Sequence, residues 1–482
     1  MLFLLLALPL GVFLAGTVPL GHVADEPAHL LRADGLLYGD FIGHRVPVTL
    51  PDGRQTIASG VRADMALLSV VTLPIRTVDP VPQTITAEMV QRARAVSWTG
   101  HQTFVNLSYT ASYMPLFYLP AAIALGVAKL VGIAPFQAFI AARLANLLCF
   151  AAMGSAALLF ARRGQIVMFW ALAVPMTLNV AASASQEGLL IASSVLAAAL
   201  ITRASEGAAL RAVSRSPLYW TAAGLIACVA TVKPPYLPLA AMLLLPLPIE
   251  GDRRASWHEF GRRAAAIALV SLPVFGWTWL AIHHASVPRM LDSYEAGPLW
   301  PGPRPAIFEY ADVAAQLRVL LAAPTRFVTL PLLHLWNDKA MPSEIIGVLG
   351  WLNLVLPRTL YLLWTIALVA AIFGDCVGAK DSTASRFRWA ELPLLLGAAV
   401  AAIFGIYISQ YLIWTPVGMP WIGGPQGRYL LPLFPVLALA LPRLGLPGGA
   451  GLRHALLALP LAAAGADVLM LPRVVVGFYY LS

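Results

Sequence analysis

The sequence predicts an all-α polytopic membrane protein, a bundle of about eleven transmembrane helices. Of its 482 residues, 59% are hydrophobic and only 11% are charged, whereas soluble domains carry about 25% charged residues. The mean hydropathy is +0.76. Apolar stretches close to the roughly 20 residues that cross a bilayer recur along the whole chain. We therefore expect one integral membrane domain over residues 1–482.

The basic excess and the scattered cysteines exclude other classes of protein. The formal net charge is +9, and in a membrane protein such an excess holds cytoplasmic loops against anionic lipid. No basic run is interleaved with aromatic residues, so membrane lipid is an expected partner and nucleic acid is not. Cys149, Cys228 and Cys376 lie far apart in the chain, which indicates neither a disulfide framework nor a metal cluster.

The first apolar stretch, Leu2–Leu20, is predicted to cross the membrane, and a long polar region follows it. Residues 21–135 are too many for a simple connector, and long structured loops are usually functional. Within them, Pro27–Tyr38 and Ala87–Val96 have helical spacing that suits a helix lying along the membrane surface. We expect an outer loop over residues 21–135 with juxtamembrane helices, and a second outer loop over residues 284–356.

The stretch Tyr113–Gly132 decides the topology of everything after it. It is apolar enough to cross the membrane, but it contains Pro115, Pro120 and Lys129. If it crosses, all later basic clusters face outward; if it is a juxtamembrane or re-entrant element, they all face the cytoplasm, as the positive-inside bias prefers. These clusters, which fall in alternate connections, are Arg162-Arg163; Arg203, Arg211 and Arg215; Arg253-Arg254 with Arg262-Arg263; Lys380, Arg386 and Arg388; and Arg443 with Arg453.

We therefore predict that Tyr113–Gly132 does not cross, that the N-terminus is cytoplasmic and that the C-terminus is outside. The crossings that follow Leu2–Leu20 are expected at Phe136–Phe160, Ile166–Ala182, Gln186–Thr202, Pro217–Val232, Pro235–Pro248, Ala264–His283, Pro357–Gly374, Leu392–Trp414, Tyr429–Leu441 and His454–Leu471.

This topology gathers carboxylates and fixed cations on the outer face. The residues concerned are Asp25, Glu26 and His29 after the first crossing, Gln186 and Glu187 at the start of a helix, Lys233 before two prolines, and Gln426, Arg428 and Tyr429 at the start of another helix. A carboxylate can deprotonate a hydroxyl group, and arginine and lysine can hold a phosphate and offset the charge of a leaving group. Glycosyl transfer from a lipid phosphate needs these residue types.

Each residue also has a purely structural interpretation, which the sequence leaves open. Glu187 suits the N-terminus of a helix, Lys233 can extend to lipid headgroups, and Arg428 can anchor a helix at the interface. His29 suits a local hydrogen bond within the loop. No metal ligand set is predicted, and a divalent metal as cofactor is left open.

Several short motifs, in a fixed order over nearly the whole chain, carry a resemblance to a known family. They are Asp25-Glu26-Pro27-Ala28-His29, Ser112-Tyr113-Met114-Pro115-Leu116-Phe117-Tyr118-Leu119-Pro120, Arg143-Leu144-Ala145-Asn146, Ala184-Ser185-Gln186-Glu187-Gly188, Lys233-Pro234-Pro235-Tyr236, Gly347-Val348-Leu349-Gly350-Trp351-Leu352 and Gln426-Gly427-Arg428-Tyr429-Leu430-Leu431-Pro432. With them the sequence resembles the DUF2142 membrane proteins and, more distantly, the GT-C superfamily of polyprenyl-phosphate-sugar glycosyltransferases.

The GT-C resemblance implies a catalytic acid just after the first helix, which would make Asp25 the base and Glu26 its neighbour in catalysis. It also implies a second acid at the start of a later helix, where Glu187 stands, and an inverting enzyme that moves a sugar from a polyprenyl-phosphate carrier to a glycan, lipid or protein acceptor. Because they share the outer face, His29, Glu187, Lys233, Gln426, Arg428 and Tyr429 are expected to bind substrate. The expected location is the outer face of a bacterial inner membrane. Two alternatives are a transporter or flippase of lipid-linked saccharides and a non-catalytic assembly protein of envelope polysaccharides.

Overall fold

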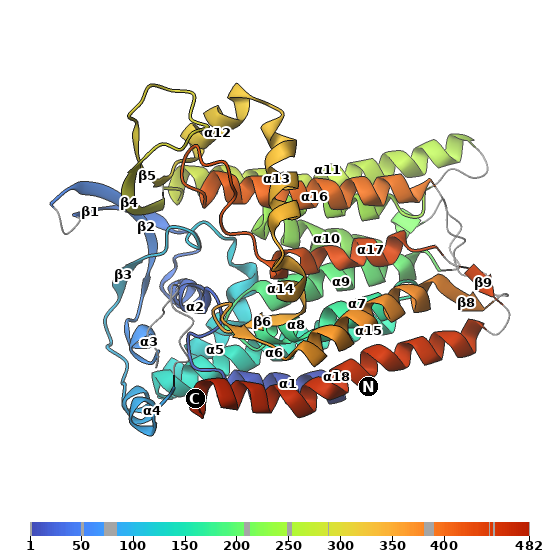
Figure 1. Cartoon of the computed structure of the whole chain (residues 1–482), viewed down its shortest axis with the longest axis horizontal. Coiled ribbons are helices and arrows are strands. Elements are labelled where there is room, and N and C mark those ends of the chain that lie inside the picture. Colours follow the sequence, from blue (N-terminus) through green and yellow to red (C-terminus); the bar gives the residue numbers. More distant parts are fainter. Residues whose placement is uncertain are drawn as a thin grey trace.

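A computed structural model describes residues 2–49, 53–71, 84–206, 213–247, 253–287, 289–379, 390–442, 444–446 and 449–481. Most of these residues are helical (Figure 1). Some members of the predicted basic clusters lie outside the described residues, namely Arg211, Lys380, Arg386, Arg388 and Arg443.

The main body is a bundle of helices that run side by side along the longest axis of the molecule (Figure 1). It is formed by α1 (Leu2–Thr17), α6 (Pro135–Phe160), α7 (Gln165–Ala173), α8 (Pro175–Ala181), α9 (Glu187–Ala204), α10 (Pro217–Val232), the 3-10 helix η4 (Pro234–Leu244), α11 (Arg253–His284), α15 (Arg358–Cys376), α16 (Glu391–Ile413), the 3-10 helix η5 (Gly427–Leu433), α17 (Phe434–Ala440) and α18 (Gly449–Tyr480). Every predicted crossing overlaps one or two of these helices.

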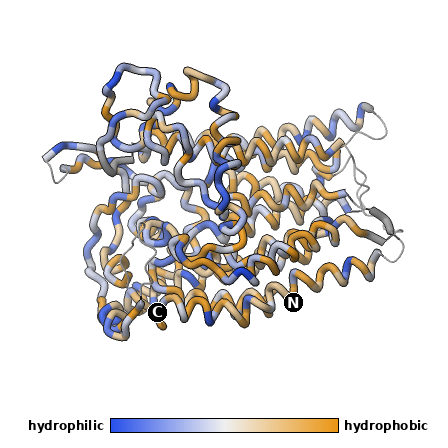
Figure 2. Tube along the Cα trace, in the orientation of Figure 1, coloured by the Kyte–Doolittle hydropathy of each residue, from blue (hydrophilic) through white to orange (hydrophobic). Residues whose placement is uncertain are grey.

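The bundle is apolar along its length and polar at its ends, as Figure 2 shows. Among the described residues, six helices are long and apolar enough to cross a membrane: α6, α9, α11, α15, α16 and α18. The pair α12 (Val313–Ala322) and α13 (Arg326–Asn337) also passes this test, but it is bent by 100°. The remaining bundle helices are shorter, and α7 ends where Pro175 starts α8.

The predicted juxtamembrane element at Tyr113–Gly132 forms the short 3-10 helix η2 (Pro115–Tyr118) and then α5 (Leu119–Leu130). The 12 residues of α5 span about 18 Å at 1.5 Å per residue, less than the roughly 30 Å of a hydrocarbon core. The helix packs against α6 and against α2 (Glu26–Gly35), which belongs to the first loop.

The first loop also contains strands, which the all-α prediction did not include. The strands β1 (His44–Thr49), β2 (Gln55–Ala63) and β3 (Thr103–Asn106) form an antiparallel sheet in the order β1-β2-β3. At Gly60, opposite Asn106, a Cβ atom would lie 1.8 Å from the carbonyl oxygen of Val105, so only glycine fits. The sheet lies beyond one end of the bundle (Figure 1), which we call the sheet end.

The loop that follows α11 lies at the sheet end as well (Figure 1). It contains the antiparallel strands β4 (Arg289–Glu295) and β5 (Ile307–Ala311), then α12, α13 and α14 (Met341–Gly347), and the short pair β6 (Val348–Leu349) and β7 (Leu354–Val355). Short helices α3 (Ala66–Ser69) and α4 (Ala87–Arg94) complete the first loop. Both long loops therefore surround the same end of the bundle.

Close packing of α8 on α9 fixes the start of α9. A Cβ atom on Gly188 would lie 2.5 Å from the Cα atom and 2.9 Å from the backbone nitrogen of Ala181. Because these are backbone atoms of α8, one helix would have to move. Gly188 directly follows Glu187, so this contact sets the position of a predicted site residue.

We predict that Gly188→Ala destabilises the protein by about 1–3 kcal/mol, the usual cost of overpacking a core. The matched control is Gly224→Ala on α10, where a Cβ atom meets nothing within 4 Å and the change to a better helix former is neutral or stabilising. Thermal unfolding of the two purified variants measures the difference. Equal midpoints would contradict the packing argument.

Candidate functional site

Asp25 lies between α1 and α2 at the sheet end, and its backbone is left-handed, with φ 65° and ψ 0°. Few residues other than glycine adopt this conformation, which costs free energy and is often found at functional sites. Hydrogen bonds on both sides hold it: the amide of Ala24 donates to the carbonyl of Gly350 at 3.1 Å, and the amide of His29 donates to the carbonyl of Asp25 at 3.1 Å.

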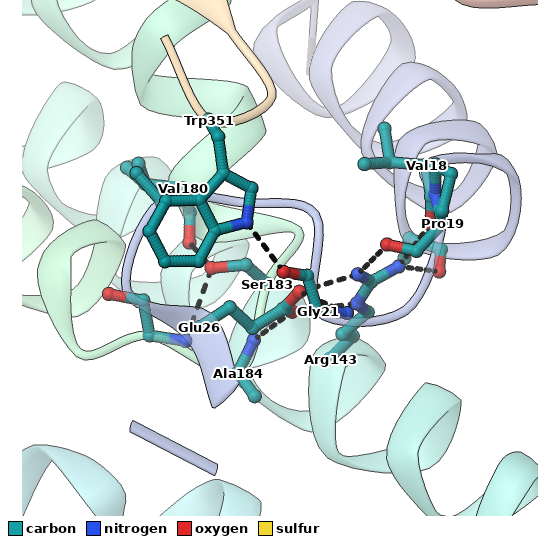
Figure 3. A network of polar contacts seen from close by, with 12 residues as sticks. Val18, Pro19, Gly21, Glu26, Arg143, Val180, Ser183, Ala184 and Trp351 are labelled. Carbon is teal, nitrogen blue, oxygen red and sulfur yellow. Dashed lines mark hydrogen bonds and ion pairs between the residues drawn. The ribbon is translucent and has the colours of Figure 1, made fainter. Parts of the chain in front are cut away.

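Glu26, the next residue, is completely buried and pairs with Arg143 of α6 (Figure 3). The guanidinium donates to both carboxylate oxygens, at 2.7 and 2.6 Å. It also donates to the carbonyls of Ala15, Val18 and Pro19, which end α1. The pair therefore joins α6 to the end of α1 and to the start of α2.

The remaining hydrogen-bonding capacity of Glu26 is used as well. Its carboxylate accepts from the amides of Gly21, at 3.1 Å, and Ala184, at 2.9 Å. Trp351 closes over this network and donates its indole N–H to the carbonyl of Gly21 at 2.8 Å (Figure 3). A carboxylate with this many partners and no exposure is a structural anchor. The catalytic role expected for Glu26 therefore does not fit its surroundings.

Glu187 begins α9 and pairs at 2.5 Å with Lys233, the residue that directly follows α10. The turn before Glu187 is held by the Asn146 amide, which donates to the carbonyls of Ser183 and Ser185. The side chain of Glu187 is only 2% exposed. Its second oxygen has no hydrogen-bond partner among the described residues, and buried polar atoms are normally paired.

Arg428 of η5 joins the start of α2. It donates to a carboxylate oxygen of Asp25 at 2.5 Å and to the carbonyl of Ala24 at 3.1 Å. The next residue, Tyr429, presents its ring to both cations of the site: the Lys233 ammonium lies 4.3 Å and the Arg428 guanidinium carbon 5.4 Å from the ring centroid. Residues more than 400 positions apart in the sequence thus meet at one site.

A polar cavity of about 170 Å³ lies over these residues at the sheet end. Asp25, Glu187 and Lys233 bring charge to it, whereas Arg428 lies behind its wall, 1% exposed. The other polar and aromatic residues of its lining are His29, Ser108, Tyr109, Thr110, Ser112, Tyr113, Ser286, Gln410, Trp414, Gln426 and Tyr429.

His29 lines the cavity as a neutral base. Burial lowers its pKa to about 4, although the charges of Asp25 and Glu187 act in the opposite direction. Its Nδ1 lies 2.6 Å from the hydroxyl oxygen of Tyr118, and its ring stacks on Tyr113 with centroids 6.3 Å apart. The folded state therefore keeps this imidazole uncharged at neutral pH.

An apolar groove of about 270 Å³ adjoins the cavity. It runs between the ends of α10 and η4 and the helices α11 and α16, and its lining includes Val232, Pro235, Trp277 and Ile406. The cavity and the groove share Ser112, Tyr113, Lys233, Ser286, Gln410, Ile413 and Tyr429. Lys233 therefore lies where the polar cavity meets the apolar groove.

The structure brings most of the predicted site residues together. Asp25, His29, Glu187, Lys233, Gln426 and Tyr429 line the cavity, and Arg428 contacts Asp25 from behind. Glu26 lies in the buried network instead. Tyr109, Gln410 and Trp414 also line the cavity and were not predicted, although a glutamine near the end of an otherwise apolar helix was a usable signal.

The described ranges contain no group of three or more histidine, cysteine, aspartate or glutamate side chains placed to hold a metal ion. The charged groups of the cavity are paired with one another instead, each carboxylate with one cation. These pairs make the site nearly neutral, which lowers the cost of burying or partly burying four charges.

The apolar bundle defines an integral membrane protein, and a polar, partly buried cavity lies at one of its ends. The chain belongs to the DUF2142 family: the family model, described as "Predicted membrane protein (DUF2142)", matches residues 8–437. No curated protein and no solved structure matches the chain. The family match thus covers the sheet end, the cavity and the groove together.

We predict that Glu26→Gln leaves Arg143 buried without a balancing charge and destabilises the protein by about 3–5 kcal/mol. The control is Glu88→Gln on α4, whose carboxylate is 70% exposed and pairs only with Arg92 among the described residues; exposed pairs contribute about 0–1 kcal/mol. The yield of folded protein and its unfolding midpoint measure the effect. A Glu26→Gln variant as stable as the control would refute the anchoring role.

Proposed function

We propose that this protein is a GT-C-type inverting glycosyltransferase that moves a sugar from a polyprenyl-phosphate carrier to an acceptor on the outer face of a bacterial inner membrane. The acceptor is a hydroxyl of a glycan, lipid or protein. The observation that carries this proposal is the junction at Lys233, where a polar cavity lined by two carboxylates and one cation, with Arg428 directly behind its wall, meets an apolar groove. A molecule with an anionic head and a long apolar tail matches both compartments.

In this proposal the tail occupies the groove and the phosphate lies near Lys233 and Arg428. Both cations are suited to a phosphate because charge-assisted hydrogen bonds to phosphate oxygens are strong. The sugar and the acceptor share the cavity, whose hydroxyl, amide and aromatic side chains suit a sugar ring. The second oxygen of Glu187, which has no partner among the described residues, would accept a hydrogen bond from a substrate hydroxyl.

The reaction is one displacement at the anomeric carbon. The acceptor oxygen forms a bond to that carbon while Asp25 takes the hydroxyl proton. The bond between the anomeric carbon and the phosphate oxygen breaks, and the electron pair leaves with the polyprenyl phosphate. Lys233 and Arg428 offset the negative charge that develops on the leaving group.

Donor binding would also change the ion pairs of the site. Asp25 is held by Arg428 at 2.5 Å and Glu187 by Lys233 at 2.5 Å. A phosphate competes with both carboxylates for these cations. When Arg428 turns toward the phosphate, the Asp25 carboxylate loses its partner and is free to accept the proton of the acceptor hydroxyl. In this way the donor would activate the residue that deprotonates the acceptor.

The orientation rests on where the basic residues lie. The connection between α6 and α7 and the starts of α11 and α18 are all at the end opposite the sheet end (Figure 1). They contain Arg162-Arg163, Arg262-Arg263 and Arg453, and short basic loops stay in the cytoplasm. We therefore assign eleven crossings, with α7 and α8 as one and η5 and α17 as another, and the cavity on the outside.

The same junction favours a second candidate. A transporter or flippase of lipid-linked saccharides would also hold a polar head in a cavity and an apolar tail in a groove. Such proteins usually place charged residues at the middle of the membrane, whereas Asp25, Lys233 and Arg428 lie near helix ends. A non-catalytic assembly protein would need neither the base nor the two cations.

We predict that Asp25→Asn lowers sugar transfer from polyprenyl-phosphate sugars by about 10²–10⁴-fold, the usual contribution of a general base, while donor binding survives. Glu88→Gln again serves as control and keeps full transfer. Reconstituted protein, radiolabelled donor and a donor-binding assay give the two readouts. Full transfer by Asp25→Asn would remove this residue from the chemistry. Movement of intact donor across sealed vesicles without transfer would favour the flippase.

The orientation predicts the reactivity of single cysteines in a background in which Cys149, Cys228 and Cys376 are replaced by alanine. A membrane-impermeant maleimide added to intact spheroplasts should label Thr103→Cys in β3 and should spare Arg162→Cys between α6 and α7 until the cells are opened. The reverse pattern would place the cavity on the cytoplasmic side and overturn the proposed donor class.

A further inference from the structure

We propose that α12 and α13 form a bent amphipathic pair that inserts one apolar face into the membrane interface at the sheet end. Neither helix can cross a membrane alone, because their 10 and 12 residues span about 15 and 18 Å at 1.5 Å per residue. The bend of 100° between them prevents one combined crossing. This inference does not depend on the proposed chemistry.

The exposed face of the pair is apolar and regular. Its large side chains recur at every fourth position, which is the spacing of one helix face. They are Leu317 and Leu321 on α12, exposed by 39% and 60%, and Val328, Leu332 and Trp336 on α13, exposed by 49%, 51% and 76%, with Leu333 beside them at 52%. Val313, one turn before Leu317, lines the polar cavity and is not part of this face. An apolar face of this extent is rare on a surface that meets only water.

The opposite face of the pair is fixed to the bundle. Gln316 is fully buried, donates to the carbonyls of Tyr411 and Thr415 and accepts from the amide of Gly418. Val319, Leu320 and Leu330 pack against Tyr407 and Tyr411 of α16 in one apolar cluster. The exposed side chains therefore cannot turn inward, because the inward positions are already occupied.

The exposed face lies beside a bundle helix that also exposes large apolar side chains. Both α12 and α13 contact α16, which exposes Leu396 and Val400. In Figure 1, α13 runs across the bundle helices near the sheet end, nearly perpendicular to them. A helix that lies across the bundle axis runs parallel to the membrane plane, as an interfacial helix must.

The charges of the pair suit a lipid surface and not an aqueous partner. Between Val313 and Trp336 the only Lys, Arg, Asp or Glu residues are Arg318 and Arg326. Arg326 donates to the carbonyl of Val319 at 2.7 Å and so ties the two helices together. Arg318 is exposed and can reach phosphate headgroups, while Trp336 is a typical interface residue.

The test compares two variants of the full-length protein, each with one spin label and with the three native cysteines replaced by alanine. Both are reconstituted in vesicles. Leu332→Cys carries the label on the proposed membrane face. The matched control is Ile57→Cys on β2, an apolar side chain of nearly the same exposure, 52%, which lies in the sheet. Collision of each label with oxygen, which concentrates in lipid, and with a water-soluble nickel chelate is measured by electron paramagnetic resonance.

We expect the label at position 332 to collide at least several-fold more often with oxygen than with the nickel chelate, and the label at position 57 to show the reverse. Equal values at the two positions would place the pair in water and overturn the proposal. Low collision rates with both reagents at position 332 would mean that a protein covers this face, which would overturn it as well. The binding of a donor plays no part in either readout, so failure of the proposed function leaves the result unchanged.

Discussion

The buried ion pair between Glu26 and Arg143 is the interaction on which the sheet end depends. The Arg143 guanidinium donates hydrogen bonds to carbonyls at the end of α1 that have no partner within the helix. The Glu26 carboxylate accepts hydrogen bonds from the amides of Gly21 and Ala184. Four segments meet at this point: the end of α1, the start of α2, the middle of α6 and the turn before α9. Loss of either partner would leave a buried charge, so the four segments are positioned together or not at all.

The cavity follows from that arrangement. Asp25 is next to Glu26, and Glu187 follows Ala184 by three residues, so both carboxylates are placed by the same network. Two cations from later parts of the chain pair with these carboxylates: Arg428 with Asp25, and Lys233 with Glu187. In a partly buried region such pairs hold charged groups in place. Pairing therefore keeps these groups ordered without closing the cavity.

Hydropathy was enough to predict the helices of the bundle, because burial in lipid requires long apolar stretches. Hydropathy did not predict that α11 and α18 extend beyond their apolar stretches. Polar residues such as Arg253–Arg263 continue the helix, but a search for apolar stretches leaves them out. The sheet was missed because β1 and β3 have only 6 and 4 residues and their pattern is weak outside the membrane.

The site was predictable in part for a topological reason. Residues at alternate helix ends must share one face, and Asp25, Glu187, Lys233 and Arg428 do share the sheet end. The separate roles of Asp25 and Glu26 were not predictable, because they depend on Arg143, which lies 117 residues away from Glu26. Neighbours in the sequence suggest one shared role, whereas the left-handed turn at Asp25 sends the two carboxylates to different places.

That turn has a consequence for how position 25 can vary. Asparagine is among the few side chains that adopt positive φ at modest cost, whereas branched or bulky ones resist it. Replacing Asp25 by asparagine therefore removes the charge and preserves the shape of the side chain. Glutamate at this position would have a longer side chain and a higher cost of adopting positive φ. The backbone itself restricts which amino acids can occupy this position in the cavity wall, independently of any chemistry they perform.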